Sequence, residues 1–212
     1  MKGWEVGFNL GTSHSLTEIG GSRDVSRGFV FDTQFETTSI NFGVFGKYRF
    51  NELIAATAGF NYGHIHGADS LSPIESSRYA RGFSFENNIY ELSVRGEAYT
   101  PPLIPFVPLD FFGYIGIAGF YHDPILRVPN PEQYEFEEFN NFAVALPIGL
   151  GASYTLLRNY KISLDIGWRK TFTNYLNGFT RPASQGYNSY YFTALKFSYS
   201  FDDGQRMHTR FR

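Results

Sequence analysis

The sequence predicts an all-β fold: a transmembrane antiparallel β-barrel of about eight strands with both termini in the periplasm. The first observation is an alternation with a period of two residues, which indicates β-strands. It is clearest over residues 141–155, 160–171 and 189–201, where apolar and aromatic residues alternate with glycine, small polar residues and isolated charges. Such strands fit a barrel with its apolar face in lipid and its polar face inside.

The second observation is the composition. The chain has 212 residues, of which 42% are hydrophobic and 19% aromatic. This aromatic content is typical of barrels whose strand ends lie in aromatic girdles at the two membrane interfaces. No apolar run of about 18 residues occurs, so we expect no transmembrane helix. A closed barrel is then the remaining structure that pairs every backbone group in lipid.

Charge and cysteine content exclude some function classes. The formal net charge is -2 at pH 7, whereas a protein that binds nucleic acid needs a basic surface. The chain has no cysteines, so disulfides and thiol chemistry are excluded. No motif points to a cofactor, and outer-membrane lipids are the first partner that the pattern implies.

The first four strands show their apolar faces at alternate residues. They are expected over residues 3–14, 37–50, 53–65 and 82–98. Their apolar faces carry, for example, Trp4, Ile40, Ile54 and Tyr90. The intervening residues are glycine, asparagine, serine and charged residues, as a polar lumen requires.

The last four strands are expected over residues 111–121, 141–155, 160–171 and 189–201. Residues 111–121 are apolar on both faces, so the sequence does not assign their orientation. The other three alternate regularly, and the last of them ends with an aromatic residue, Phe201. An even number of strands agrees with the rule for single-chain bacterial barrels.

Long and short connections alternate along the chain. Residues 15–36, 66–81, 122–140 and 172–188 are long and polar, residues 50–52 and 156–159 are tight turns, and residues 100–110 form a proline-rich link. Bacterial barrels keep short turns in the periplasm and long loops outside. We therefore expect a barrel over residues 1–201 and a short periplasmic tail over residues 202–212.

The N-terminus passes directly into a strand pattern at Gly3. No basic segment followed by an apolar stretch precedes it. Because a protein of the cell outer membrane needs an export signal, we expect either the mature form, from which the signal peptide has been removed, or a form expressed without it and with Met1 as an added start.

The polar faces place charges of both signs in the barrel interior. The expected lumen charge network consists of Glu5, Lys47, Arg49, Glu91, Arg95, Glu97, Asp165, Arg169 and Lys196. An eight-stranded barrel is just wide enough for side chains to fill, and buried charges are costly unless they pair. We therefore expect an interior plugged by ion pairs, which argues against a porin.

Two groups of residues suggest chemistry without completing a site. His64 and His66 share a strand face, with Asp69 beyond, but a metal site needs a further placed ligand. Ser13 and His14 invite a lipid-hydrolase interpretation, but no nucleophile elbow accompanies them. We expect no catalytic residues and no metal site, and interpret these residues as part of the barrel rim.

Two connections have unusual compositions. The segment 132–138 is acidic and is either a calcium-binding loop or a solvated one. In the link 100–110, prolines frame an apolar set, Leu103, Ile104, Phe106 and Val107. This set either docks a partner or lies against the inner leaflet, since exposed apolar patches commonly mark interfaces.

Three stretches resemble the PorG family, small outer-membrane barrels of the type IX secretion system of Bacteroidetes. They are residues 81–97 following Gly67–Ser70, residues 146–151, and the segment 168–177. The third is the most specific, and its family residues are Arg169, Thr171, Thr173, Asn174, Tyr175, Leu176 and Asn177. The family usually has aspartates at positions 174 and 177, which questions any cation-binding role in this chain.

The resemblance implies a non-enzymatic part of the secretion and gliding machinery. It would anchor the periplasmic ring complex of a PorK-like lipoprotein and a PorN-like protein to the outer membrane. The candidate partner contacts lie at the periplasmic end and are Leu103, Ile104, Phe106, Val107, Arg206, Arg210 and Arg212. Two alternatives remain: an OmpA-like or OmpX-like structural or adhesion barrel acting through its extracellular loops, and a lipid-modifying enzyme.

Overall fold

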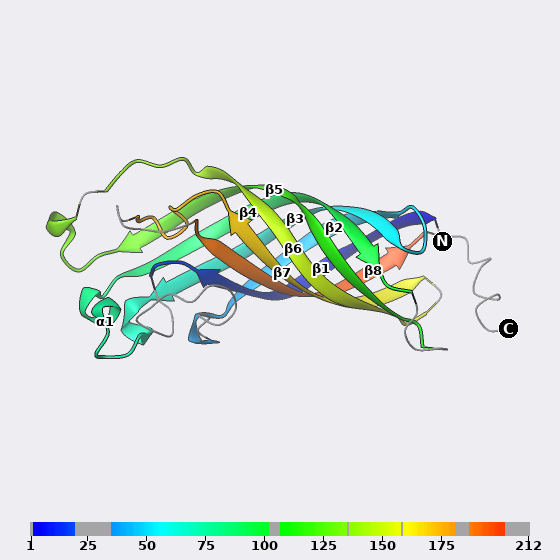
Figure 1. The fold of residues 1–212 in the computed structure, drawn as a ribbon, viewed down its shortest axis with the longest axis horizontal. Coiled ribbons are helices and arrows are strands. Elements are labelled where there is room, and N and C mark those ends of the chain that lie inside the picture. The colour runs from blue at the N-terminus through cyan, green and yellow to red at the C-terminus, as the bar shows by residue number, and fades with distance from the viewer. Residues whose placement is uncertain are drawn as a thin grey trace.

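Eight antiparallel strands form one closed barrel in which each strand pairs with its neighbours in sequence (Figure 1). The barrel closes where β8 pairs back with β1, from Glu5 opposite Ser200 to Leu16 opposite Ser189. This computed structural model describes residues 2–19, 35–101, 107–134, 136–157, 159–180 and 187–201. The predicted fold class is confirmed.

All eight expected strands are present, and apart from the end of the fifth their bounds are close to those read from the sequence. They are β1 (Gly3–Leu16), β2 (Ser39–Arg49), β3 (Ile54–Ala68), β4 (Ser84–Tyr99), β5 (Leu109–Arg127), β6 (Phe142–Thr155), β7 (Tyr160–Thr171) and β8 (Ser189–Ser200). The helical elements are the short turns η2 (Phe35–Thr37), η3 (Asp69–Leu71) and η4 (Pro131–Gln133) and the helix α1 (Ser77–Arg81). Within the described residues, every helix is too short or too polar to cross a membrane.

β5 extends well beyond its expected end at residue 121. Its last residues pair with the start of β4, from Ser84 opposite Arg127 to Asn88 opposite Asp123. The pairing with β6 stops at Tyr121, so Pro124 lies where β5 has a strand on one side only. Proline is tolerated at such an edge because its missing N–H leaves no ladder hydrogen bond unmade. The proline therefore does not end the strand.

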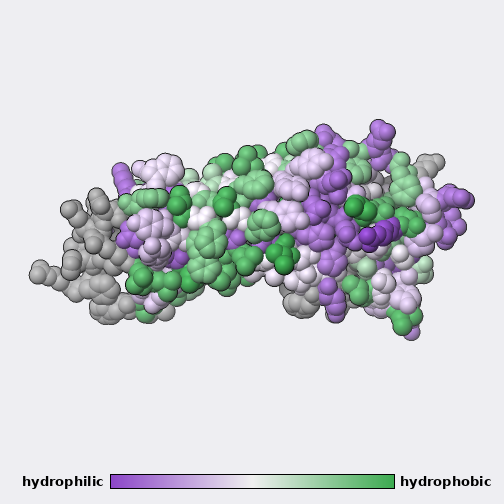
Figure 2. Space-filling view, turned by 180° about the vertical axis from the view of Figure 1, so that it is seen from behind, coloured by the Kyte–Doolittle hydropathy of each residue, from purple (hydrophilic) through white to green (hydrophobic). Residues whose placement is uncertain are grey.

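Successive side chains of each strand, including β5, alternate between the lumen and the outer wall that faces lipid. Even-numbered residues of β5 such as Phe112, Tyr114 and Phe120 are buried, whereas Ile115 and Ile117 are exposed on the outer wall. On the face seen in Figure 2, hydrophobic side chains gather over the middle of the barrel and hydrophilic residues toward the loop end. This distribution suits an outer wall in lipid.

An aromatic girdle marks the loop end of this band. The rings of Phe42, Tyr62, Tyr90, Tyr121 and Phe142 follow one another across β2 to β6, with centroids 5.0, 5.3, 6.3 and 5.1 Å apart. Such a row is typical of the membrane–water interface, where an amphipathic ring contacts both lipid and water.

A second girdle lies at the turn end. Trp4 packs on Tyr48 at 5.0 Å, and Tyr199 packs on Tyr160 and on Phe201, both at 5.2 Å. With a strand rise of about 3.3 Å and a tilt of about 40°, a ten-residue step along a strand gives a height of about 25 Å. On β5 the exposed Phe111 lies ten residues before Tyr121, so this step matches the apolar band of outer-membrane barrels.

The hydrogen-bond ladder between β5 and β6 is interrupted once. Pairing is continuous up to Ile115 opposite Ile148 and resumes at Ala118 opposite Ala145. Pro147 lies in the gap on β6, and a proline cannot donate to the ladder. The β5–β6 ladder therefore lacks its hydrogen bonds at this point.

Candidate functional site

The charges predicted for the lumen lie inside the barrel. The structure places all nine there, on β1, β2, β4, β7 and β8. Eight are buried, and Arg49, near the turn end, is partly exposed. Because the strands are tilted, residues far apart in sequence meet across the lumen, and the charges fall into three groups.

The first group surrounds Lys47 and Glu97. The Lys47 ammonium lies 3.0 Å from Glu97 and 3.8 Å from Glu5. Glu5 also pairs with Lys161 at 2.7 Å. The Tyr99 hydroxyl donates to Glu97 at 2.7 Å and accepts a hydrogen bond from Lys47 at 2.8 Å. Several partners for each buried charge offset the loss of its hydration.

The second group is centred on Asp165. Arg95 lies 3.2 Å from Asp165 and 3.1 Å from Glu97, so it connects this group to the first. Lys196 also pairs with Asp165, and the Tyr114 hydroxyl donates to it at 2.8 Å. The Arg95 guanidinium stacks on the Tyr114 ring at 4.3 Å.

The third group joins Arg169 and Glu91. The Arg169 Nε atom lies 3.3 Å from Glu91, and Nη1 donates to the Gly167 carbonyl at 2.8 Å. The Tyr190 hydroxyl donates to the same carboxylate at 2.8 Å. The guanidinium also lies over the Phe192 ring at 4.5 Å. This group links the ionic part of the lumen to the aromatic part nearer the loops.

Two interior charges were missed by the sequence analysis. They are Lys161, which pairs with Glu5, and Asp110, which lies 3.7 Å from Arg49. Lys161 is two residues before Ser163 and therefore shares its lumen-facing side, so the alternation held the signal. Asp110 was missed because the sequence analysis placed it in the link 100–110, whereas β5 begins at Leu109.

The loops close the other end of the barrel. Ile19, Phe83, Tyr134, Leu176 and Phe179 come from all four loops and pack in one hydrophobic cluster. The Phe83 ring lies 4.9 Å from Tyr134 and 5.4 Å from Phe179. We call this cluster the loop cap. It gives the mouth of the barrel an apolar core of its own.

The family-motif residues at 169–177 run from the lumen into this cap. After Arg169, Thr171 donates to the Asn188 carbonyl at 2.6 Å. The Thr173 hydroxyl accepts from the Tyr175 N–H at 3.1 Å, and the Asn174 carbonyl accepts from the Asn188 side chain at 2.7 Å. These bonds shape the chain as it leaves β7.

Leu176 and Asn177, at the end of the motif, are fully buried. The Leu176 carbonyl accepts from the Asn87 side chain at 2.6 Å, and Asn177 Oδ1 accepts from the Phe179 N–H at 3.1 Å. The end of the motif therefore covers the lumen. The hydrogen bond at position 177 uses an amide oxygen, so this geometry requires no carboxylate there.

Ser13 and His14 point to opposite sides of β1. Ser13 is buried and donates to the backbone carbonyls of Ile40, at 3.3 Å, and His64. Successive side chains on a strand alternate between its faces, so His14 projects outward. The two residues do not form a hydrolase pair.

His64 and His66 have neighbours other than a metal. Their Nδ1 atoms lie 3.0 Å from Asn88 Oδ1 and 2.8 Å from Ser39 Oγ, respectively. Asp69 is instead held by Arg81 at 2.6 Å. Over the residues that the structure describes, no three histidine or carboxylate side chains converge as metal ligands.

The acidic segment 132–138 contacts the loop cap. The Tyr175 hydroxyl donates to Glu137 at 2.5 Å, and this hydrogen bond raises the pKa of Tyr175. Glu135 lies outside the described residues. The carboxylate of Glu137 therefore already has a protein partner in this loop.

Of the candidate partner contacts, only Val107 falls within the described residues, where its side chain is 38% exposed. Leu103, Ile104, Phe106, Arg206, Arg210 and Arg212 lie outside them, as does the expected tail over residues 202–212. The contact surface at the turn end stays a prediction.

A family model described as a domain of unknown function, DUF6089, matches residues 5–202. No curated protein matches the chain.

Among solved structures, OprG from Pseudomonas aeruginosa, an outer membrane protein, is similar with a TM-score of 0.52 and 11% identity, over 94% of this chain and 97% of that one. Neisserial surface protein A has a TM-score of 0.50 and 8% identity, over 93% and 97%. At these identities the similarity supports the barrel fold alone.

Proposed function

The chain belongs to the DUF6089 family, and from its barrel and the motifs above we propose that it is a non-enzymatic outer-membrane component of the type IX protein secretion and gliding machinery. In this proposal it resides in the outer membrane with its short turns in the periplasm. There it anchors a periplasmic ring complex of PorK-like and PorN-like proteins. The resemblance of residues 81–97, 146–151 and 168–177 to the PorG family supports this role.

The filled interior supports an anchor over a conduit. Linked ion pairs occupy the turn half of the lumen, and the loop cap closes the other end. A small barrel filled in this way has little space for cargo. Its contribution to a secretion machine is then a fixed position in the membrane and a binding surface.

The docking site is inferred from a set of exposed leucines on the short turns. Leu53 lies between β2 and β3, and Leu156 and Leu157 lie between β6 and β7; their exposed fractions are 48%, 50% and 66%. Turns favour glycine, proline, asparagine, aspartate and serine. Exposed apolar side chains at the same end of a barrel are typical of an interaction surface.

The experiment that tests the proposal is affinity purification from the native outer membrane. The test variant replaces Leu156→Ser and Leu157→Ser together and should fold and insert normally. We expect it to recover PorK-like and PorN-like partners at least tenfold less than the unmodified protein, since buried apolar anchors dominate interfaces. Secretion should fall in parallel.

The matched control is Ile74→Ser, which removes an exposed aliphatic side chain at the opposite end. Ile74 is 78% exposed in the loop between β3 and β4. Partner recovery should be unchanged in this variant. Loss of partners from Ile74→Ser but not from the leucine variant would reject the proposed orientation or the anchoring role.

A second candidate is a structural or adhesion barrel that acts through its extracellular loops. The loop cap favours it, because a packed core holds the outer surface in one shape. Leu71, Ile74 and Tyr79 are exposed on that surface. In this case Ile74→Ser should reduce binding of whole cells to a host or neighbouring surface, and the leucine variant should not.

A further inference from the structure

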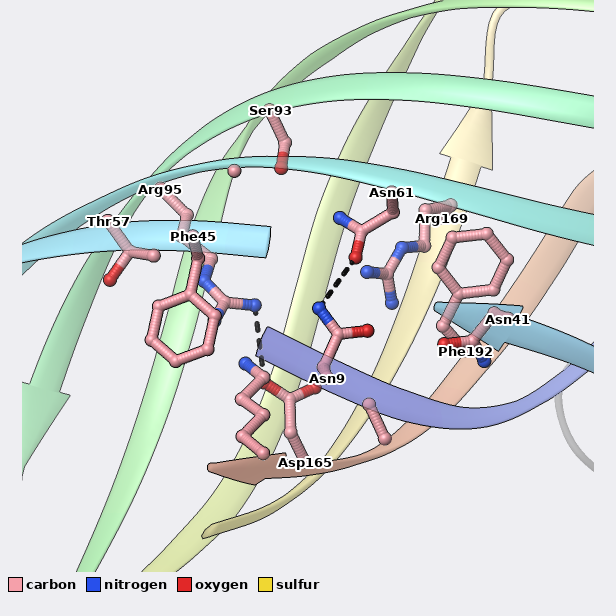
Figure 3. Close-up of a pocket in the computed structure, with 13 residues that line it drawn as sticks. Asn9, Asn41, Phe45, Thr57, Asn61, Ser93, Arg95, Asp165, Arg169 and Phe192 are labelled. Atoms are coloured by element: carbon pink, nitrogen blue, oxygen red, sulfur yellow. Dashed lines mark hydrogen bonds and ion pairs between the residues drawn. The ribbon is translucent and has the colours of Figure 1, made fainter. Parts of the chain in front are cut away.

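A small polar cavity lies in the lumen between the ion pairs and the aromatic side chains below the loop cap. Its volume is about 20 Å³. Asn9, Asn41 and Asn61 line it together with the cations Arg95 and Arg169. In Figure 3 Asn9 and Asn61 point toward each other, and the Arg169 guanidinium lies beside them. The cavity separates the Asp165 group from the Arg169 group.

Two amide oxygens at this cavity have unmet hydrogen-bonding capacity. Asn9 donates to Asn61 at 3.0 Å, and Asn41 donates to the carbonyls of Thr12 and Thr193 at 2.5 and 3.3 Å. These bonds orient both amides. The Oδ1 atoms of Asn9 and Asn41 are then buried without a hydrogen-bond partner among the described residues.

A buried amide acceptor is normally hydrogen-bonded, and leaving one unpaired is strongly unfavourable. The occupant must therefore donate hydrogen bonds to these oxygens. It must also tolerate Arg95, Arg169 and Lys196, which line the same cavity. Asp165 also lines the cavity, but it is already paired with Arg95 and Lys196, so the surroundings stay positive and disfavour a cation. An anion offers nothing to an amide oxygen. Water both donates and accepts.

The volume of the cavity also agrees with water as its occupant. A cavity needs roughly 10–15 Å³ of accessible space to hold one water, which then makes two to four hydrogen bonds to polar neighbours. We propose that this cavity is a binding site for ordered water, with one or two molecules that satisfy Asn9 and Asn41 and accept hydrogen bonds from the neighbouring cations. The bound water completes the polar layer between the ion pairs and the loop cap.

The direct test uses the full-length protein in lipid bilayers. Solid-state NMR with water-edited transfer should show rapid magnetisation transfer from water to the Asn9 and Asn41 side-chain amides, despite their burial. A crystal structure at high resolution should show ordered density between Asn9 and Arg169. A dry cavity in both measurements would overturn the proposal.

The matched test compares two substitutions of equal size at Ala194, which also lines the cavity. Ala194→Val fills the space without a hydrogen-bond donor, whereas Ala194→Thr supplies a hydroxyl of the same size. We expect the valine variant to unfold with an equilibrium constant about tenfold or more above that of the threonine variant. Equal stabilities of the two folded variants would count against bound water.

Halide soaking separates water from a bound anion. Bromide should give no anomalous density in the cavity if water is the occupant. Bromide density between Arg95 and Arg169 would overturn the proposal in favour of an anion site.

Discussion

Asp69 and Arg81 form a bidentate ion pair that closes the loop between β3 and β4. Arg81 Nε donates to Asp69 Oδ2 at 2.6 Å and Nη2 donates to Oδ1 at 2.8 Å. Nη2 also donates to the Glu18 carbonyl at 2.9 Å, and the Phe83 N–H donates to Asp69 Oδ2 at 3.1 Å. One ion pair thus fixes the first two loops to each other beside the loop cap.

We predict that Arg81→Ala opens this loop. Both side chains are at least 95% buried, and removal of the arginine takes the bidentate cation away from a buried carboxylate, which costs about 3–5 kcal/mol. Hydrogen exchange at the Asp69 and Phe83 amides should accelerate while the strands stay protected. Arg81→Lys should restore only part of the protection, because an ammonium cannot reproduce the bidentate geometry.

The control for this prediction is Arg127→Ala. Arg127 pairs with Glu86 at 2.7 Å, but both side chains are well exposed. An exposed pair contributes about 0–1 kcal/mol, so exchange in the loop should change little. Equal effects of the two arginine variants would contradict a special role for Asp69 and Arg81.

A second prediction concerns the lumen pair of Arg169 and Glu91. Arg169→Ala removes the cation paired with the fully buried Glu91, whose hydrogen bond from the Tyr190 hydroxyl remains. The variant should reduce the free energy of unfolding by about 3–5 kcal/mol. Urea titration in detergent, followed by the heat-dependent shift on SDS gels, measures the change. An effect no larger than that of Arg127→Ala would mean that the interior charges are well hydrated.

The strands and their lumen charges could be predicted because a period of two assigns faces without knowledge of the fold. The specific partners could not. Glu91 and Arg169 meet across the lumen although 78 positions separate them, and that meeting depends on strand tilt and register. The orientation of β5 also stayed open, since its glycine, isoleucine and aromatic residues suit either face.

The loop cap was not predicted for a related reason. Ile19, Phe83, Tyr134 and Leu176 lie in four loops without a periodic pattern, and each loop is polar overall. Only the closure of the barrel brings them together. The resemblance at residues 168–177 singled out this segment, and the asparagines at 174 and 177 argued against a cation-binding role there. It did not predict that Leu176 and Asn177 cover the lumen.

A third prediction tests how tightly the interior is packed. A Cβ atom at Gly167 would lie 2.0 Å from the Tyr114 hydroxyl and 2.3 Å from Arg169 Nη1. Gly167→Ala should therefore destabilise the barrel by about 1–3 kcal/mol through overpacking. At Gly46 a Cβ would meet nothing within 4 Å, so Gly46→Ala is the matched control. Similar unfolding midpoints for both variants would contradict a close-packed lumen.

A fourth prediction concerns conductance. The ion pairs from Lys47 to Asp165 and the loop cap above them leave no wide aqueous path through the described residues. The purified protein in a planar bilayer should show no steady conductance at neutral pH. An open porin in the same bilayer serves as the positive control. Large, stable single-channel steps from the pure protein would reject the plugged interior.

The last prediction concerns the lipid-facing wall. Leu164 is 50% exposed on the outer face of β7, midway between Tyr160 and Trp168. An arginine at the bilayer midplane costs about 2–4 kcal/mol, and near an interface about 0–1 kcal/mol. Leu164→Arg should therefore lower the free energy of unfolding in liposomes far more than Leu157→Arg, which places the same charge on a turn. Ser163→Ala, on the lumen side of the same strand, loses one hydrogen bond to Ser153 and should cost about 1 kcal/mol. If Leu164→Arg is as mild as the turn variant, the outer wall of β7 does not face lipid.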